Sequence, residues 1–206
     1  SFMLDQKFAD AGAKINSDLS SVDIIFKVNA PNNDELDKLK NGTTIISFFQ
    51  IKDEVANIQK YLDNKLTLFS MSHIPRTTLA QNMDALSSQS NIAGYKSAIV
   101  GSDHIANYMP LLMTAAGTIQ PAKVLILGAG VAGLAAIATA KRLGAQVFAF
   151  DVRPIVKEQV ESLGAKFVEV ESESDEGVGE GGYAKEVSDE YKQKQSELIK
   201  KTIAKM

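Results

Sequence analysis

The sequence contains no cysteine and no tryptophan, and it has only two histidines among 206 residues. Without cysteine the chain can form no disulfide, no thiolate nucleophile and no thiolate metal site, so it is compatible with a reducing compartment. His73 and His104 lie about 31 positions apart without clustered acidic or thiol ligands, which argues against a metal site. We therefore expect neither a disulfide scaffold nor a bound metal.

The chain also lacks a strong excess of charge of either sign. Its net charge is −3, with 45% hydrophobic and 23% charged residues, which is typical of a soluble globular chain of one or two domains. No clustered basic surface that would neutralise a phosphate backbone is visible, so we expect no nucleic-acid partner. Residues 1–4 (SFML) show no basic region followed by an apolar one, and we expect no signal peptide.

Long hydrophobic runs are limited to one. Residues 124–140 contain no charged side chain, and a stretch of about 17 residues is close to the shortest that spans a membrane. Its first part, Val124–Leu127, is aliphatic and ends in glycines, whereas its second part is rich in alanine with helical spacing. This pattern favours a strand, a tight turn and a buried helix over a membrane span.

Runs rich in β-branched residues alternate with polar, helix-compatible stretches along most of the chain. Such alternation indicates parallel strands joined by crossover helices, and hence an α/β fold. The predicted strands cover residues 22–28, 43–49, 66–69, 124–127, 146–150 and 167–170. The predicted helices cover about residues 53–62, 91–108 and 184–206, besides one that follows the glycines after residue 127.

The long helix predicted from Asn91 indicates a division into domains, because it ends before Pro110 and leads into a linker with further turn residues. We expect an N-terminal α/β domain over residues 1–90, a connecting helix and linker over 91–121, and a second α/β domain over 122–206.

The segment Gly128–Gly133 has the sequence GAGVAG directly after a predicted strand and before a predicted helix. This is the GxGxxG fingerprint of dinucleotide binding in its proper context. Gly128 permits the sharp turn, Gly130 lets the backbone approach a diphosphate, and Gly133 lets the helix pack closely on the strand. The diphosphate would lie on the helix N-terminus. The alternative is a glycine-rich turn that only packs a helix on a sheet.

An acidic residue stands where the adenosine ribose of a dinucleotide is usually bound. Asp151 ends the next predicted strand, 18 residues after Gly133, and its carboxylate can accept hydrogen bonds from the ribose hydroxyls. Because the carboxylate would repel a 2′-phosphate, we expect NAD rather than NADP. Arg153 could approach a 2′-phosphate, or could equally be a solvated loop charge.

The number of predicted strands is small for two domains of this type. A complete Rossmann domain has six strands in two halves, whereas residues 122–206 account for three and the N-terminal domain lacks a first strand–helix unit. We therefore expect two Rossmann-like parallel-sheet domains joined by a long helix, each incomplete in this chain.

Four stretches carry a resemblance to a known family. They are Lys27–Pro31 (KVNAP), Arg76–Tyr95 (RTTLAQNMDALSSQSNIAGY), Thr114–Gly117 (TAAG) and Phe150–Pro154 (FDVRP). Together they resemble the alanine dehydrogenase and transhydrogenase α-subunit superfamily, over a length that runs from about Phe8 to the C-terminus. The polar loop from Arg76 and an insertion after the last predicted strand point to the NAD(H)-binding component of proton-translocating nicotinamide nucleotide transhydrogenases.

The resemblance implies which residues would bind NAD(H). Those expected at the nicotinamide end are Arg76, Gln81, Asp84 and Ser87, with Gln81 orienting the carboxamide. Those expected along the rest of the cofactor are Gly128, Gly130, Val131, Gly133, Asp151, Arg153 and Tyr183. Direct hydride transfer between two nicotinamide rings needs no general acid or base, so polar positioning residues suit such a site. The residues alone would equally fit an ordinary helix start with capping and surface polar groups. Leu79 departs from the family, whose members can have a basic residue there.

The insertion at residues 171–182 (ESESDEGVGEGG) is acidic and rich in glycine. Such a segment cannot bury enough apolar area to offset the entropy of ordering it. The resemblance implies a lid that folds over NAD(H) and supplies Tyr183, and the alternative is a surface loop with no role.

The resemblance also implies partners that the chain does not contain. It implies a homodimer that docks an NADP(H)-binding component and is linked to a membrane proton channel. The chain would then be a soluble domain, without a span of its own, on the cytoplasmic or matrix side of an energy-transducing or organellar inner membrane.

Two other functions stay open. An NAD-dependent alanine or other amino-acid dehydrogenase would need a catalytic histidine and an acid, and Lys27 matches a position that resembles a substrate-contacting lysine of alanine dehydrogenases. A lysine at a strand end is, however, more often simply exposed. A non-catalytic NAD-binding module would share the glycine fingerprint without using the polar loop.

Overall fold

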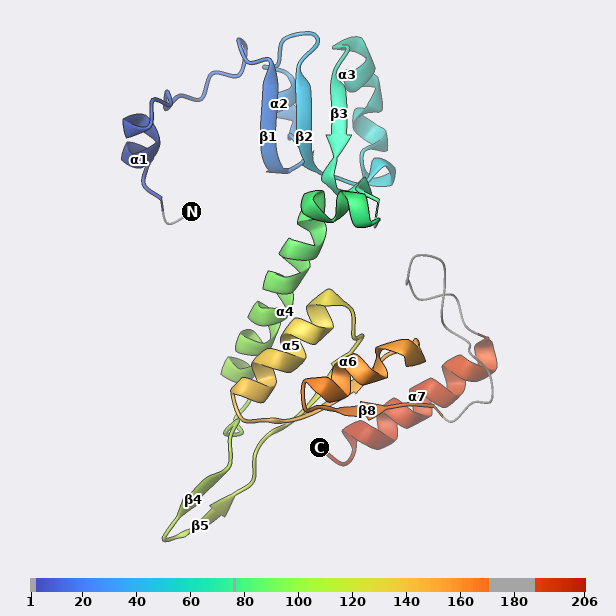
Figure 1. Ribbon diagram of the computed structural model, residues 1–206. Helices are drawn as coiled ribbons and strands as arrows, with labels where there is room; N and C mark the ends of the chain where they lie inside the picture. Colours follow the sequence, from blue (N-terminus) through green and yellow to red (C-terminus); the bar gives the residue numbers. More distant parts are fainter. Residues whose placement is uncertain (1–2, 76, 171–187) are drawn as a thin grey trace. The chain divides into compact units, whose positions relative to one another are not determined.

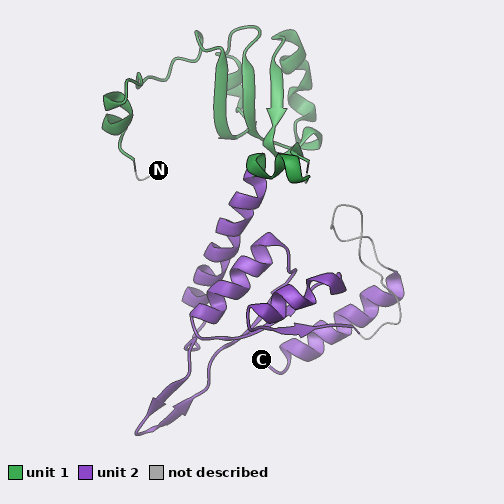
Figure 2. Cartoon of the chain, in the orientation of Figure 1, with its two compact units in different colours: residues 1–84 green, residues 85–206 purple. Residues whose placement is uncertain are grey.

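The computed structural model describes residues 3–75, 77–170 and 188–206. The chain forms two compact units, residues 1–84 and residues 85–206 (Figure 2). Each unit contains a three-stranded sheet in which all strands are parallel. The predicted α/β fold with two Rossmann-like parallel sheets is confirmed.

Unit 1 is built on a sheet with the strand order β1–β2–β3 (Figure 1). Its helices and strands are α1 (Asp5–Asp10), β1 (Ile24–Asn29), α2 (Asn33–Leu36), β2 (Thr44–Phe48), α3 (Ile58–Asp63) and β3 (Thr67–Ser70). Single 3₁₀ turns cover Ile51–Asp53, Val55–Asn57 and Met71–His73, and a longer 3₁₀ segment covers Thr78–Met83. The core gathers around the central strand, where Ile45 contacts Leu36, Leu39 and Tyr61 in one buried cluster.

Unit 2 is built on a sheet with the strand order β6–β7–β8. Helices α5 and α6, which follow the first two strands, lie above β8 in Figure 1, and α7 lies below it. Its elements are α4 (Ala85–His104), β4 (Leu112–Thr114), β5 (Gly117–Ile119), β6 (Lys123–Leu127), α5 (Val131–Arg142), β7 (Gln146–Phe150), α6 (Lys157–Ser162), β8 (Lys166–Val168) and α7 (Asp189–Ile203), with a 3₁₀ turn at Pro154–Val156. The core joins α5, β7 and α6 through the fully buried side chains of Ile137, Ala149 and Val160.

Two local features fix the position of α5 between its neighbours. Gly144 follows the helix in a left-handed conformation with φ +94°, and a Cβ there would lie 2.5 Å from the Cβ of Pro110. On another side of α5, α4 packs closely, and Gly94 is the buried residue of α4. A Cβ on Gly94 would lie 1.9 Å from the carbonyl oxygen of Ala132, so the two helix backbones touch.

The helix predicted over residues 53–62 is wrong in its first half. Only Ile58–Asp63 is α-helical, and two 3₁₀ turns precede it. The Glu54 carboxylate accepts hydrogen bonds from Asn57 Nδ2 at 3.0 Å and from the Tyr61 hydroxyl at 2.5 Å. Such local side-chain bonds hold the chain in tight turns in place of a regular helix. Burial, followed by the hydrogen bond to Glu54, raises the pKa of Tyr61.

The long helix begins earlier and ends earlier than predicted. It covers Ala85–His104 in place of about 91–108. The serine-rich segment after Ala85 resembles a loop in composition, but it forms the first turns of the helix. At the other end, the Ala122 N–H donates to the carbonyls of Tyr108 and Met109 at 3.1 Å each. This non-local pairing takes the chain out of the helical path before Tyr108.

The linker predicted after Pro110 contains a β-hairpin. β4 and β5 pair antiparallel, with Leu112 opposite Ile119, and all six strand residues are exposed. The last predicted strand is observed at Lys166–Val168 in place of 167–170, and the C-terminal helix is described over Asp189–Ile203. Within the described ranges, no helix is both long enough and apolar enough to cross a membrane.

Candidate dinucleotide-binding site

The segment Gly128–Gly133 forms the tight connection from β6 to α5. Gly128 has φ +94°, in the left-handed region that favours glycine, and its N–H donates to the carbonyl of Phe150 at 2.8 Å. A Cβ on Gly133 would lie 1.8 Å from the carbonyl oxygen of Gly128. Gly133 therefore lets the first turn of α5 fold back against the turn itself, as its position in the fingerprint predicts.

Gly130 leaves the N-terminus of α5 open. It is the N-cap residue, has φ −79° and provides no side-chain cap. Among the residues that the structure describes, the one heavy atom within 4 Å of a Cβ built on it is Nη2 of Arg153, at 4.0 Å. The first N–H groups of an α-helix have no partner within the helix, and they lie at the positive end of its dipole. Because Gly130 has no Cβ, a diphosphate could approach the backbone N–H groups at this helix N-terminus closely.

Asp151 follows β7 directly and is bonded to this turn. Its side chain is buried, with a residue exposure of 8%. The carboxylate oxygen Oδ2 accepts a hydrogen bond from the Ala129 N–H at 2.7 Å and from Nη2 of Arg153 at 2.9 Å. The other oxygen, Oδ1, accepts from the backbone N–H and from Nε of Arg153, both at 2.9 Å. Asp151 is thus bonded directly to the glycine-rich turn.

These bonds set the ionisation of Asp151. Burial alone would disfavour the carboxylate, but the hydrogen bonds from the Arg153 side chain, the Ala129 N–H and the Arg153 N–H outweigh burial, so the pKa of Asp151 is lowered. The same pair raises the pKa of Arg153, mainly through its hydrogen bonds to Asp151. Both groups are charged at neutral pH.

Arg153 is not the solvated loop charge that the sequence allowed. Its side chain is 15% exposed and pairs with Asp151 through two nitrogens. Because its N–H also binds Asp151, the segment after β7 is fixed at both its backbone and its side chain. The pairing could not be read from the sequence, since nothing in the residue types specifies which direction an arginine side chain takes.

Asp151→Asn is expected to lower the free energy of unfolding by about 1–3 kcal/mol at neutral pH, because the charged partner of Arg153 and of the Ala129 N–H is lost. The folded-state pKa of Asp151 lies below the unfolded-state value near 3.8. The stabilisation is therefore fully present above that value and disappears as the pH falls through the folded-state pKa. Urea unfolding of both proteins as a function of pH measures this, and a difference that stays constant down to the acid limit contradicts it.

Three of the four residues expected at the nicotinamide end lie in the 3₁₀ segment Thr78–Met83, directly after it, or in the first turn of α4. Gln81 is exposed on this segment, and Asp84 follows it with its N–H donating to the carbonyl of Gln81 at 3.2 Å. Ser87 is half-buried in the first turn of α4. Leu79 is 93% exposed. Arg76, Tyr183 and the insertion at 171–182 lie outside the described residues.

Lys27, which matches a position of alanine dehydrogenases, and His73 both have partners within the chain. The Lys27 ammonium donates to the Glu35 carboxylate, which also accepts from the Asn32 N–H and completes a capping box at α2. Nδ1 of His73 lies 3.0 Å from the Ser70 hydroxyl. In the part of the chain that the structure describes, no three His, Cys, Asp or Glu side chains form a cluster that could hold a metal ion.

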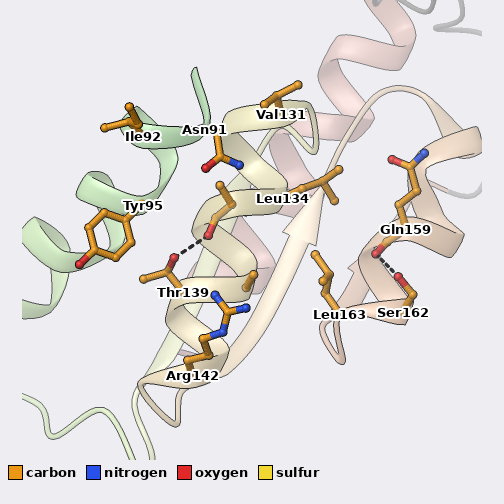
Figure 3. A pocket seen from close by; sticks show the side chains of 12 residues that line it. Asn91, Ile92, Tyr95, Val131, Leu134, Thr139, Arg142, Gln159, Ser162 and Leu163 are labelled. Atoms are coloured by element: carbon orange, nitrogen blue, oxygen red, sulfur yellow. Dashed lines mark hydrogen bonds between the residues drawn. The ribbon is translucent and has the colours of Figure 1, made fainter. Parts of the chain in front are cut away.

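A separate hollow lies between α4, α5 and α6 (Figure 3). Its volume is about 630 Å³. Its lining residues are Asn91, Ile92, Tyr95, Val131, Leu134, Ala135, Ala138, Thr139, Arg142, Gln159, Ser162 and Leu163. The hydroxyls of Thr139 and Ser162 donate to carbonyls of their own helices, at 2.7 and 2.8 Å. Val131 is the one expected cofactor residue in this lining.

Sequence reasoning missed the part that Ala129 takes in the site. Its N–H holds Asp151, and its side chain is buried in the core, so no polar side chain marked the position. The site also depends on Gly94, whose contact with Ala132 sets the start of α5. A glycine inside a helix costs about 1 kcal/mol relative to alanine, and that cost was the available signal for a close approach.

Comparison with known proteins shows the family of the chain. Residues 97–206 match the family model described as "Alanine dehydrogenase/PNT, C-terminal domain", and residues 1–93 match "Alanine dehydrogenase/PNT, N-terminal domain". The chain belongs to the alanine dehydrogenase/PNT family.

Among relatives in this family, the NAD(P) transhydrogenase subunit alpha of Haemophilus influenzae is 45% identical over 196 residues, which cover 94% of this chain and 38% of that subunit. The crystal structure of transhydrogenase from Sinorhizobium meliloti matches with a TM-score of 0.82 and 41% identity, over 100% of this chain and 55% of that one. An alanine dehydrogenase of Staphylococcus haemolyticus is 31% identical over 160 residues, 75% of this chain and 42% of that enzyme. The chain thus spans roughly half the length of these relatives, or less.

Proposed function

We propose that this chain is the NAD(H)-binding part of a proton-translocating NAD(P) transhydrogenase, which exchanges hydride between NAD(H) and an NADP(H) held by a partner component. The observation that carries the proposal is the open N-terminus of α5 at Gly130, with the buried carboxylate of Asp151 bonded to the same turn. The 45% identity to a transhydrogenase subunit, against 31% to an alanine dehydrogenase, favours this activity within the family.

In this proposal the glycine-rich turn and Asp151 bind the adenosine half of the cofactor. Gly130 and the first N–H groups of α5 would hold the diphosphate. Asp151 would accept the ribose hydroxyls, and its negative charge favours NAD(H) over NADP(H). Val131, the first residue of α5, is 37% exposed beside them and offers apolar contact.

Gln81, Asp84 and Ser87 position the nicotinamide ring, together with Arg76. Bound NAD(H) supplies the hydride or accepts it. The chain needs no acid or base for this transfer, since no proton moves with the hydride; its residues contribute orientation and exclusion of water. The amide of Gln81 suits this task, because it can donate to and accept from a carboxamide at once. Closure of residues 171–182 over the site, with Tyr183, stays a prediction.

Gln81→Asn is expected to lower the rate of hydride exchange by about tenfold or more while leaving NADH affinity within about twofold, because the amide moves by one methylene and misorients the ring. The measurement is exchange between NADH and an NAD analogue after mixing the intact protein with a purified NADP(H)-binding transhydrogenase component. NADH binding is followed in parallel by fluorescence. Gln89→Asn, an exposed glutamine on α4, makes the same change away from the loop and serves as the control.

Exchange that requires the added component and is lost only in Gln81→Asn supports the proposal. Unchanged exchange in this variant removes the role of Gln81. Formation of NADH from NAD and L-alanine without any added component would make the chain part of an alanine dehydrogenase, and would overturn the proposed activity. The ion pair of Lys27 with Glu35 speaks against a lysine reserved for such a substrate.

We further propose the partners that this activity requires. They are an NADP(H)-binding component, a membrane component that conducts protons, and a second copy of this chain. Exposed apolar side chains on the hairpin are consistent with a protein partner, since Leu112, Met113 and Ile119 are 36%, 73% and 52% exposed. The chain would act beside an energy-transducing or organellar inner membrane, on its cytoplasmic or matrix side.

A further inference from the structure

The carboxylate of Asp151 is fully used by the chain itself. An ionised carboxylate has about four lone-pair sites for hydrogen-bond donors. Within the described residues Asp151 accepts four hydrogen bonds, two at each oxygen, over distances of 2.7 to 2.9 Å. A ribose hydroxyl can therefore donate to Asp151 only after one of these donors has moved away.

The four donors differ in how easily they can leave. Two are backbone N–H groups, of Ala129 in the glycine-rich turn and of Arg153 in the segment after β7. They are fixed by the fold. The other two are Nε and Nη2 at the end of the Arg153 side chain, which can rotate. Each carboxylate oxygen holds one donor of each kind, so departure of the guanidinium frees one site on each oxygen. Two neighbouring free sites match the two hydroxyls of a ribose diol.

The guanidinium lies beside a second place where an anion fits. Nη2 of Arg153 is the nearest heavy atom to a Cβ built on Gly130, at 4.0 Å. That space is where the diphosphate of a dinucleotide would meet the N-terminus of α5. A small rotation would exchange the carboxylate for a phosphate oxygen, so the arginine would keep an anionic partner.

We propose that Arg153 is a displaceable positioning residue: without ligand it occupies the ribose sites on Asp151, and it passes to the diphosphate when a dinucleotide binds. The proposal rests on the proposed binding of NAD(H) at this turn. A ligand with a ribose but no phosphate must break the Asp151–Arg153 pair and offers the guanidinium no phosphate in its place. A ligand with a diphosphate breaks the pair and also gives the guanidinium a new anionic partner. The pair thus makes affinity for the ribose depend on the phosphate groups.

The experiment compares adenosine and ADP as probes, by calorimetry on the intact protein at neutral pH, with NADH as a reference. Arg153→Met removes both guanidinium donors. Adenosine affinity is expected to rise about three- to tenfold, because the ribose no longer competes with the guanidinium. The advantage of ADP over adenosine is expected to fall by about tenfold, because the phosphate contact is lost. A merely structural arginine would weaken both probes.

Two further variants sharpen the comparison. Arg153→Lys keeps the charge but cannot hold both carboxylate oxygens as a fork does, so adenosine affinity rises by less and the advantage of ADP is retained. This variant also carries the test if Arg153→Met does not fold. Lys157→Met breaks the neighbouring exposed pair with Glu169, whose atoms are 2.5 Å apart. It removes the same charge from the same segment and is expected to change neither affinity.

The outcomes separate this inference from the function on which it rests. If NADH and ADP do not bind the unaltered protein, the proposed function fails and the role of Arg153 falls with it. If NADH binds but adenosine affinity is unchanged or lower in both Arg153 variants, Arg153 is not displaced and only this inference is overturned.

Discussion

Gly94→Ala is expected to lower the free energy of unfolding of the unit formed by residues 85–206 by about 3 kcal/mol or more, whereas Gly101→Ala in the same helix raises it by up to about 1 kcal/mol. Both changes add one methyl group to α4 (Ala85–His104). They differ only in what that methyl group meets, so the pair measures the contact itself.

The contact at Gly94 is backbone to backbone. An added Cβ would lie 1.9 Å from the carbonyl oxygen, 2.7 Å from the carbonyl carbon and 2.9 Å from the Cα of Ala132. No side-chain rotation relieves such an overlap, so α4 has to move away from the first turn of α5. At Gly101 no atom of the described part of the chain lies within 4 Å of an added Cβ, and alanine there gains the ordinary difference in helix propensity over glycine.

Urea unfolding followed by circular dichroism measures both variants. NADH affinity of Gly94→Ala provides a second readout, because a shifted α5 carries Val131 and the N–H groups of its first turn with it. If Gly94→Ala were as stable as Gly101→Ala, the close packing of α4 on α5 would be wrong, and with it the account of how α5 is positioned.

The strand–turn–helix unit around Gly128 could be predicted because its signals are local. Each part of this unit is predicted from residues within it or directly beside it. The two strands were predicted at Val124–Leu127 and Gln146–Phe150, and the structure places both within one residue of these bounds. Asp151 follows the same local logic, since it stands at the end of its strand. The pairing of Asp151 with Arg153 could not be predicted in this way, because the direction of a side chain depends on the fold.

The limits of α4 could not be predicted, for a reason that lies in its surface. Most of its residues are exposed or half-buried, and Gly94 is its one buried residue. A helix whose residues are mostly exposed or half-buried shows little apolar periodicity, so its serine-rich start was read as loop. The hairpin at Leu112–Ile119 was missed for a related reason: its turn residues are Ala115 and Ala116, which lack the asparagine–glycine or aspartate–glycine signal of a short hairpin.

The nicotinamide loop was assigned by resemblance alone. The structure explains why the residue types themselves did not predict its role. Gln81 is exposed on a 3₁₀ segment, and nothing in its spacing to Asp84 or Ser87 distinguishes it from an ordinary polar residue before a helix. A positioning residue acts on a ligand and not on the chain, so its role leaves no mark in local propensity or burial.

Alanine variants of Gly130 and Gly133, the second and third glycines of the turn, are expected to separate effects on folding from effects on binding. Gly133→Ala is expected to destabilise the unit by about 4 kcal/mol or more, because its Cβ would lie 1.8 Å from the carbonyl oxygen and 2.8 Å from the carbonyl carbon of Gly128. Gly130→Ala is expected to change stability by less than about 1 kcal/mol, because φ −79° suits any residue and, among the described residues, its Cβ meets only the flexible end of Arg153 at 4.0 Å.

For NADH binding, the informative variant is Gly130→Ala. Gly130→Ala fills the space proposed for the diphosphate, so NADH affinity is expected to fall at least about tenfold in a protein that remains folded. Thermal unfolding and NADH titration of the same samples give both quantities. A folded Gly130→Ala variant that binds NADH normally would show that the diphosphate does not approach this glycine. In that case the open helix N-terminus has no role in binding the cofactor, and Asp151 and Arg153 form a buried ion pair that only stabilises the turn.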